Sequence, residues 1–133
     1  MDLGLSGKTV IVTGASKGIG LAVARAFVAE GARVGLVARG AEALDAAQAA
    51  LRSLGGEVAV VAADLRAADQ AEQAVAFIEA RLGPVDVLVN SAGAARKRAP
   101  ETLDAAAWRE GLDAKFFTYI PVSYTHLTLP TKA

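Results

Sequence analysis

Residues 8–20 read Lys-Thr-Val-Ile-Val-Thr-Gly-Ala-Ser-Lys-Gly-Ile-Gly, and this stretch joins a run of strand-forming residues to an apolar helix. Glycines at 14, 18 and 20 can adopt φ values closed to other residues, and they let backbone amides approach an anion. The helix that follows presents its N-terminal N–H groups and its dipole to the same anion. The stretch therefore predicts a pyrophosphate site for a dinucleotide, with a tight turn that binds nothing as the alternative.

Strands and helices alternate along the chain. We expect strands at residues 8–13, 33–38, 58–62 and 85–90, and helices at 19–30, 41–54, 68–82 and from about 104. By helical spacing the first helix should bury Ile19, Val23, Ala26 and Phe27, and the second Leu44, Ala47 and Leu51.

Near-continuous apolar strands are typical of a parallel sheet that is covered by helices on both faces. Right-handed crossovers then give an α/β, doubly wound sheet of the Rossmann type with strand order 3-2-1-4. We expect a ligand in the crevice beyond the carboxyl ends of the first and fourth strands.

Composition narrows the functional class. The chain has 133 residues, which is one domain's worth. Fourteen basic and fourteen acidic side chains balance, so we expect neither nucleic acid nor a membrane as partner. Without cysteine there is no disulfide or thiolate metal site, and we expect no metal. The N-terminus has no secretory pattern, and no apolar run approaches the roughly 18 residues of a membrane span, so we expect a cytoplasmic location.

Three motifs carry a resemblance to one family. The sequence T-G-A-S-K-G-I-G at residues 13–20 resembles the T-G-x-x-x-G-I-G of short-chain dehydrogenases/reductases, rather than the G-x-G-x-x-G fingerprint. N-S-A-G at residues 90–93 is a near variant of that family's N-N-A-G, and Asp64-Leu65 after the third strand is a further match. Residues 5–120 thus resemble the N-terminal half of this family.

The resemblance implies a nicotinamide dinucleotide cofactor. Asp64 would accept a hydrogen bond from the adenine amino group, although an acid favoured by a helix dipole is the alternative. Leu65 would contribute through its backbone, and Asn90 would tie neighbouring strands together. Ser16 would either contact phosphate or cap the helix. The complete set of implied cofactor residues is Gly14, Ser16, Lys17, Gly18, Ile19, Gly20, Arg39, Asp64, Leu65, Asn90, Ala92 and Gly93.

Two cations favour NADP over NAD. Enzymes that prefer NAD place an acidic residue at the end of the second strand, where it binds the ribose hydroxyl. This chain has Ala38 there, followed by Arg39, and Lys17 lies in the glycine turn. A charge-assisted contact to a 2′-phosphate contributes about 1.5–3 kcal/mol, or roughly a tenfold to hundredfold preference. The alternative is that both side chains are merely solvated.

The family's catalytic groups are a serine and a Tyr-x-x-x-Lys pair, and neither lies in these 133 residues at the expected place. Lys115 occupies the position where the family commonly has an asparagine that supports a proton relay. We therefore expect the parent protein to be an NADP-dependent oxidoreductase that interconverts a small-molecule carbonyl and an alcohol, as a homo-oligomer. A non-catalytic dinucleotide-binding fragment is the alternative.

The composition changes near residue 120. Both tyrosines and the only histidine lie at positions 119–126, and Pro121 interrupts an expected helix. We expect residues 1–120 to form a partial dinucleotide-binding domain, truncated before the later strands. Residues 121–133 are expected to be a non-native or disordered tail.

Overall fold

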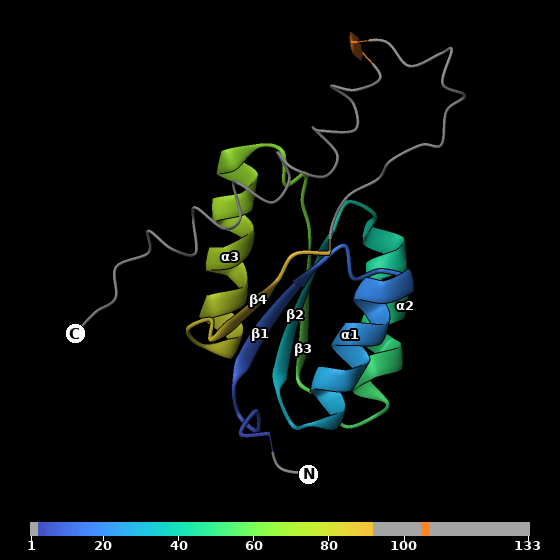
Figure 1. Cartoon of the computed structure of the whole chain (residues 1–133), viewed down its shortest axis with the longest axis vertical. Coiled ribbons are helices and arrows are strands. Elements are labelled where there is room, and N and C mark those ends of the chain that lie inside the picture. The colour runs from blue at the N-terminus through green and yellow to red at the C-terminus, as the bar shows by residue number, and fades with distance from the viewer. Residues whose placement is uncertain (1–2, 92–104, 107–133) are drawn as a thin grey trace, which may run out of the picture.

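The computed structural model describes residues 3–91 and 105–106 (Figure 1). In this part of the chain, strands and helices alternate. They are β1 (Thr9–Thr13), α1 (Gly18–Ala29), β2 (Arg33–Ala38), α2 (Ala41–Arg52), β3 (Val58–Ala62), α3 (Ala68–Leu82) and β4 (Val87–Val89).

The described strands form one parallel sheet of four strands in the order β3-β2-β1-β4. Thr9 pairs with Arg33 at the start of the β1–β2 ladder, and Val10 pairs with Val87 between β1 and β4. The expected 3-2-1-4 order and the Rossmann-type α/β fold are confirmed. Since all β1 residues are buried, the uninterrupted apolar run follows from burial on both faces.

Helices cover the two faces of the sheet unequally. Figure 1 shows α1 and α2 on one face and α3 on the other. One core cluster joins α1 and α2 to the sheet through residues such as Val12, Leu36 and Leu51. A second cluster joins α3 through Ile11, Val37 and Ile78. The helices change face at β1, which places the crevice between β1 and β4.

The buried face of α1 differs from the expected one. Its buried residues are Gly20, Ala24 and Val28, whereas the side chain of Ile19 is 80% exposed. Ala26 is exposed as well, and Val23 and Phe27 are half-buried. At Gly20 the helix approaches the end of β1 so closely that no larger residue fits there. By contrast, α2 buries Leu44, Ala47 and Leu51 as expected.

Element ends move by one or two residues relative to the sequence prediction. The expected strand at 85–90 is shortened to Val87–Val89, and just before it the carboxylate Oδ2 of Asp86 accepts a hydrogen bond from the Thr9 amide at 2.9 Å. The expected helix 41–54 ends at Arg52, where Leu54 and Gly55 donate to carbonyls three residues earlier. Gly55, at φ 87°, then reverses the chain.

None of the helices within the described residues is both long and apolar enough to cross a membrane. Ala105 and Ala106 are helical, but the rest of the helix expected from about residue 104 lies outside the described part.

Candidate functional site

The glycine turn lies where β1 ends. The Gly14 amide still donates to the Val37 carbonyl of β2, at 2.7 Å, and the chain then leaves the sheet. Gly14 has φ 64° and Gly18 has φ 61°, a backbone region that other residues rarely adopt. These two positions let the chain turn and place the first amides of α1 at the carboxyl end of β1. Such amides are donors suited to an anion.

Gly20 serves close packing rather than an unusual φ. A Cβ atom added there would collide with the carbonyl oxygen of Gly14 and lie 3.1 Å from the Cα of Ala15. The first turn of α1 therefore rests directly on the glycine turn. This contact fixes where the helix N-terminus points.

The remaining turn residues differ in exposure. Lys17 is the N-terminal cap residue of α1 and is exposed, and its side chain makes no capping hydrogen bond. Ser16 is half-buried and precedes the cap position, which Lys17 occupies, so of its two predicted roles the structure does not support that of N-cap residue. Ile19 extends from the first turn with 80% of its side chain exposed. An isoleucine this exposed beside the turn is available to contact a bound ligand.

Thr13 links the two strands that border the crevice. Its buried hydroxyl accepts a hydrogen bond from the Ser91 amide at 3.0 Å and donates to the Val89 carbonyl at 3.4 Å. Sequence reasoning assigned this linking role to Asn90, which lies half-buried directly after β4. A threonine at the end of a buried strand, before a glycine turn, is a signal that could have indicated this contact.

Arg39 and Asp64 lie at the carboxyl ends of neighbouring strands. The Ala63 amide donates to the Ala38 carbonyl at 2.9 Å, so the residues that follow, Asp64 and Arg39, leave the sheet side by side. No carboxylate stands at the end of β2, and Arg39 is exposed. The edge of the sheet beyond β2 and β3 therefore carries a cation and an anion next to each other.

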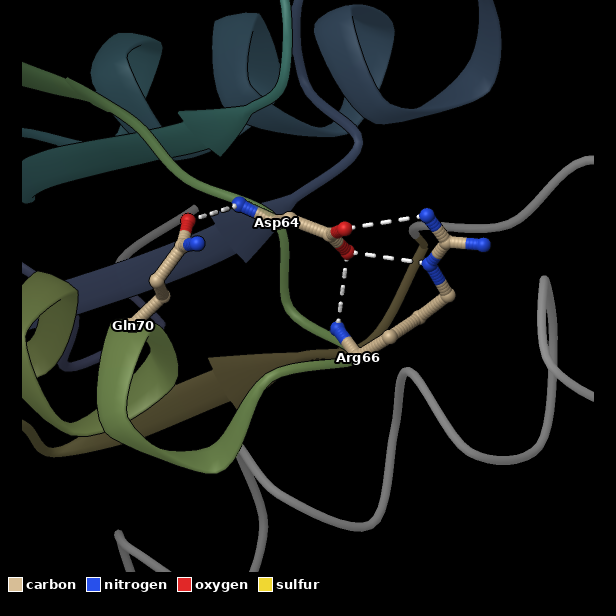
Figure 2. Close-up of polar contacts among 3 residues, drawn as sticks. All are labelled: Asp64, Arg66 and Gln70. Atoms are coloured by element: carbon tan, nitrogen blue, oxygen red, sulfur yellow. Dashed lines mark hydrogen bonds and ion pairs between the residues drawn. The ribbon is translucent and has the colours of Figure 1, made fainter.

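Figure 2 shows how the Asp64 carboxylate is held. Arg66 donates to Oδ1 from Nε at 3.0 Å and from its backbone amide at 3.0 Å, and to Oδ2 from its terminal nitrogen at 2.9 Å. The Asp64 amide donates to Gln70 Oε1 at 2.8 Å. Arg66 and Gln70 are contacts that sequence reasoning missed, because an Asp-x-Arg spacing alone does not indicate where a guanidinium lies.

These contacts shift the titration of Asp64. Hydrogen bonds from the Arg66 side chain, then from its backbone amide, hold the pKa of Asp64 below its ordinary value, and the charge of Arg39 acts in the same direction. Helix α3 begins at Ala68 and has Asp69 in its first turn, so Asp64 is not a first-turn acid. The adjoining Leu65 is buried in the core cluster under α3.

Some predicted site residues lie outside the described part of the chain: Ala92, Gly93 and Lys115, and the tail at 121–133. Within the described residues, no group of three or more histidine, cysteine or acidic side chains is arranged to hold a metal ion.

An open cavity of about 570 Å³ lies at the other end of the sheet. It is lined by the start of β3, including Val58, and by Gln48 and Arg52 of α2 and Phe77 and Arg81 of α3. None of the glycine-turn residues lines it. This cavity is therefore separate from the candidate dinucleotide site.

A family model of short-chain dehydrogenases matches residues 8–131. The chain belongs to the short-chain dehydrogenase family. Gluconate 5-dehydrogenase of Gluconobacter oxydans is 38% identical over 117 residues, which cover 85% of this chain and 46% of that protein.

Solved structures of short-chain dehydrogenases agree in fold. A variant of actinorhodin polyketide ketoreductase with NADPH is 36% identical with a TM-score of 0.86, over 96% of this chain and 49% of that one. L-sorbose reductase from Gluconobacter frateurii, complexed with NADPH and L-sorbose, is 32% identical with a TM-score of 0.85, over 94% and 48%. The chain thus spans about half the length of the relatives that it matches.

The geometry of the glycine turn and its surroundings fits a dinucleotide, independently of the comparison with relatives. The turn combines positive φ at Gly14 and Gly18 with open space around Gly18, where an added Cβ would meet nothing within 4 Å. The exposed Ile19 and the cations Lys17 and Arg39 surround the same end of the sheet. This arrangement offers backbone donors for phosphate and positive charge for a further anion.

Proposed function

We propose that this chain carries the cofactor-binding half of an NADP-dependent oxidoreductase that interconverts a carbonyl compound and an alcohol. The observation that carries the proposal is the end of β2, where Arg39 follows Ala38 beside Asp64. A carboxylate at that position would repel a 2′-phosphate, whereas a guanidinium attracts it. The NADPH complexes of two related structures support the same cofactor.

Each part of the site would hold one part of the cofactor. The amides that follow Gly14 and Gly18 would bind the pyrophosphate, with Gly20 allowing the helix to come close and Ser16 offering a hydroxyl. Arg39 and Lys17 would meet the 2′-phosphate. Leu65 and Asp64 would bind the adenine. Asn90, Ala92 and Gly93 would contact the nicotinamide-side ribose. Ile19 would cover the glycine turn. A nicotinamide dinucleotide held by these residues would supply the hydride chemistry.

The type of reaction rests on the relatives. A dehydrogenase named for gluconate and a reductase bound to L-sorbose both act on small molecules with hydroxyl or carbonyl groups. We extend that substrate class to the parent protein. We also propose that the parent protein is a homo-oligomer in the cytoplasm. Lys115, at the position of the relay asparagine, would either line the proton relay or alter it.

A second candidate is a dinucleotide-binding fragment without catalysis. The observation in its favour is that no Tyr-x-x-x-Lys pair occurs anywhere in the 133 residues. Tyrosine and lysine in that pairing provide the general acid or base of the family. The purified 133-residue chain should therefore bind the cofactor and turn nothing over. Sustained oxidation of NADPH by this chain would contradict the second candidate.

Cofactor choice is tested by titrating the purified chain with NADPH and with NADH in a calorimeter. We expect NADPH to bind roughly tenfold to hundredfold more tightly, and Arg39→Ala to remove most of that difference. Arg25→Ala, which removes an exposed cation from α1, is the matched control and should leave the ratio unchanged. Equal affinity of the wild-type chain for the two nucleotides would refute the assignment to NADP.

A further inference from the structure

Two arginines follow or adjoin the strand ends next to one carboxylate, Asp64, at the carboxyl end of the sheet. Asp64 follows β3, Arg39 follows β2, and the bond from the Ala63 amide to the Ala38 carbonyl brings the two side by side. Arg66 reaches the same carboxylate from the C-terminal side and forms an ion pair at 2.9 Å (Figure 2). The Asp64 carboxylate is thus paired with Arg66, while the charge of Arg39 acts on it from the end of the neighbouring strand.

The hydrogen bonds show which arginine holds the carboxylate. Arg66 supplies two donors to Oδ1 and one to Oδ2. A carboxylate oxygen accepts about two hydrogen bonds, so Oδ1 is filled and Oδ2 keeps one acceptor position. Gln70 fixes the backbone of Asp64 from the other side, through the amide at 2.8 Å. The carboxylate is therefore turned toward Arg66, and one acceptor position remains for a donor such as the adenine amino group.

This geometry has an electrostatic consequence for Arg39. A free aspartate beside Arg39 would pair with it and offset the positive charge that a 2′-phosphate needs. The contact with Arg66 is charge-assisted and involves two nitrogens of a planar guanidinium, which is the stronger arrangement for a carboxylate. Arg66 thus pairs with the Asp64 carboxylate, so that this carboxylate does not offset the positive charge of Arg39.

We propose that Arg66 is a positioning residue that sets the cofactor preference: by holding the Asp64 carboxylate, it keeps Arg39 available to the 2′-phosphate. This inference rests on the proposed function of the site. It assigns no direct contact between Arg66 and the phosphate. Arg66 acts on the cofactor preference through Asp64, whereas a cation that attracted the 2′-phosphate directly would act without Asp64.

The test uses the adenosine half of the cofactor, so that binding is measured without turnover. Calorimetry gives the affinities of the purified chain for adenosine 2′,5′-bisphosphate and for 5′-AMP, and their ratio reports the 2′-phosphate preference. Arg66→Ala should lower this ratio about fivefold, since exposed ion pairs are worth up to about a factor of five. Arg66→Lys should restore part of the ratio, because it keeps the charge but not the two-nitrogen contact.

The decisive comparison uses Asp64→Asn, which removes the negative charge that Arg66 holds. In an Asp64→Asn background, Arg66→Ala should leave the ratio unchanged within about twofold, because no carboxylate remains to pair with Arg39. Arg25→Ala is the control for loss of one cation, and circular dichroism melting of every variant checks that the fold persists.

The outcomes distinguish this inference from the proposed function. If the wild-type chain prefers adenosine 2′,5′-bisphosphate but Arg66→Ala has the wild-type ratio, the inference is wrong and the cofactor assignment stands. If Arg66→Ala lowers the ratio by the same factor in the wild-type and in the Asp64→Asn background, Arg66 acts on the phosphate directly. The inference is then also wrong. If the wild-type chain shows no preference for the 2′-phosphate, both proposals fail together.

Discussion

A Cβ atom on Gly20 would collide with the carbonyl oxygen of Gly14 and lie 2.9 Å from its carbonyl carbon. The first turn of α1 and the end of β1 are therefore in direct backbone contact. Because this contact aims the helix N-terminus at the crevice, it couples the packing of the fold to the proposed phosphate site.

Replacing Gly20 tests that coupling. Gly20→Ala should destabilise the chain by about 1–3 kcal/mol, since the added methyl group forces the turn and the helix apart. It should also weaken NADPH binding by about tenfold or more, because displaced amides lose their alignment with the pyrophosphate. Urea unfolding and calorimetry measure the two effects. Gly40→Ala is the comparison, since an added Cβ there meets nothing within 4 Å, and it should cost only the roughly 0.5–1 kcal/mol of a weaker N-cap residue on α2. A Gly20→Ala chain with unchanged stability would show that the contact is not as close as described.

A second prediction concerns the outer edge of β3. Amides and carbonyls alternate between the two sides of a strand, and Glu57 and Ala63 bond toward β2, so the Val58 carbonyl faces outward. Gln48 Nε2 donates to that carbonyl at 2.8 Å. Gln48→Ala should cost about 0.5–1.5 kcal/mol in urea unfolding and raise light scattering on storage, because the edge is less covered.

Gln73→Ala provides the comparison for the β3 edge. Gln73 lies exposed on α3, so its replacement makes the same change in helix propensity without removing the edge contact. Equal stability and equal scattering of the two variants would argue that Gln48 does not protect the edge.

The close approach of α3 to the sheet leads to a third prediction. A Cβ atom on Gly35 would lie 2.5 Å from Cγ2 of Ile78. Gly35→Ala should cost about 1–3 kcal/mol through overpacking, and Ile78→Ala about 2–5 kcal/mol through the cavity it leaves. Combined, they should cost about 1 kcal/mol less than their sum, since the new methyl group enters the vacated space. If the losses of unfolding free energy in the two single variants sum to that of the double variant, a Cβ at position 35 and the Ile78 side chain are not in contact.

The ion pair of Asp64 predicts a pH dependence of stability. The folded chain holds the pKa of Asp64 below the ordinary value of 3.8, chiefly through the Arg66 hydrogen bonds. The stabilisation is therefore present above about pH 4 and is lost as the pH falls through the lowered pKa. At about pH 6, Asp64→Asn should unfold with about 0.2–1 kcal/mol less free energy than wild type, as for exposed ion pairs, and this gap should close at low pH.

The control for this pH dependence is Asp45→Asn, which removes an exposed carboxylate from α2. A gap between Asp64→Asn and wild type that stayed constant from neutral to acidic pH would contradict the role assigned to the Arg66 contact.

Local patterns predicted much of the architecture. Apolar runs at residues 33–38 and 58–62 marked β2 and β3 to the residue, because burial on both faces demands such runs. The helical stripe of Leu44, Ala47 and Leu51 was likewise correct. For α1 the same periodicity rule failed, since it favours large apolar residues and the helix instead packs through Gly20 and Ala24.

The amino-acid sequence by itself determined the alternation of strands and helices, the strand order and the position of the glycine turn. The alternation and the turn depend on local properties, namely the periodicity of apolar side chains and the φ values open to Gly14 and Gly18. The strand order follows from the alternation because crossovers between parallel strands are right-handed. Only the tertiary structure decided that Ile19 is exposed, that the Thr13 hydroxyl joins β1 to the chain after β4, and that Arg66 holds Asp64 beside Arg39. Such contacts depend on how separate segments pack and on which way side chains turn, and a linear pattern records neither.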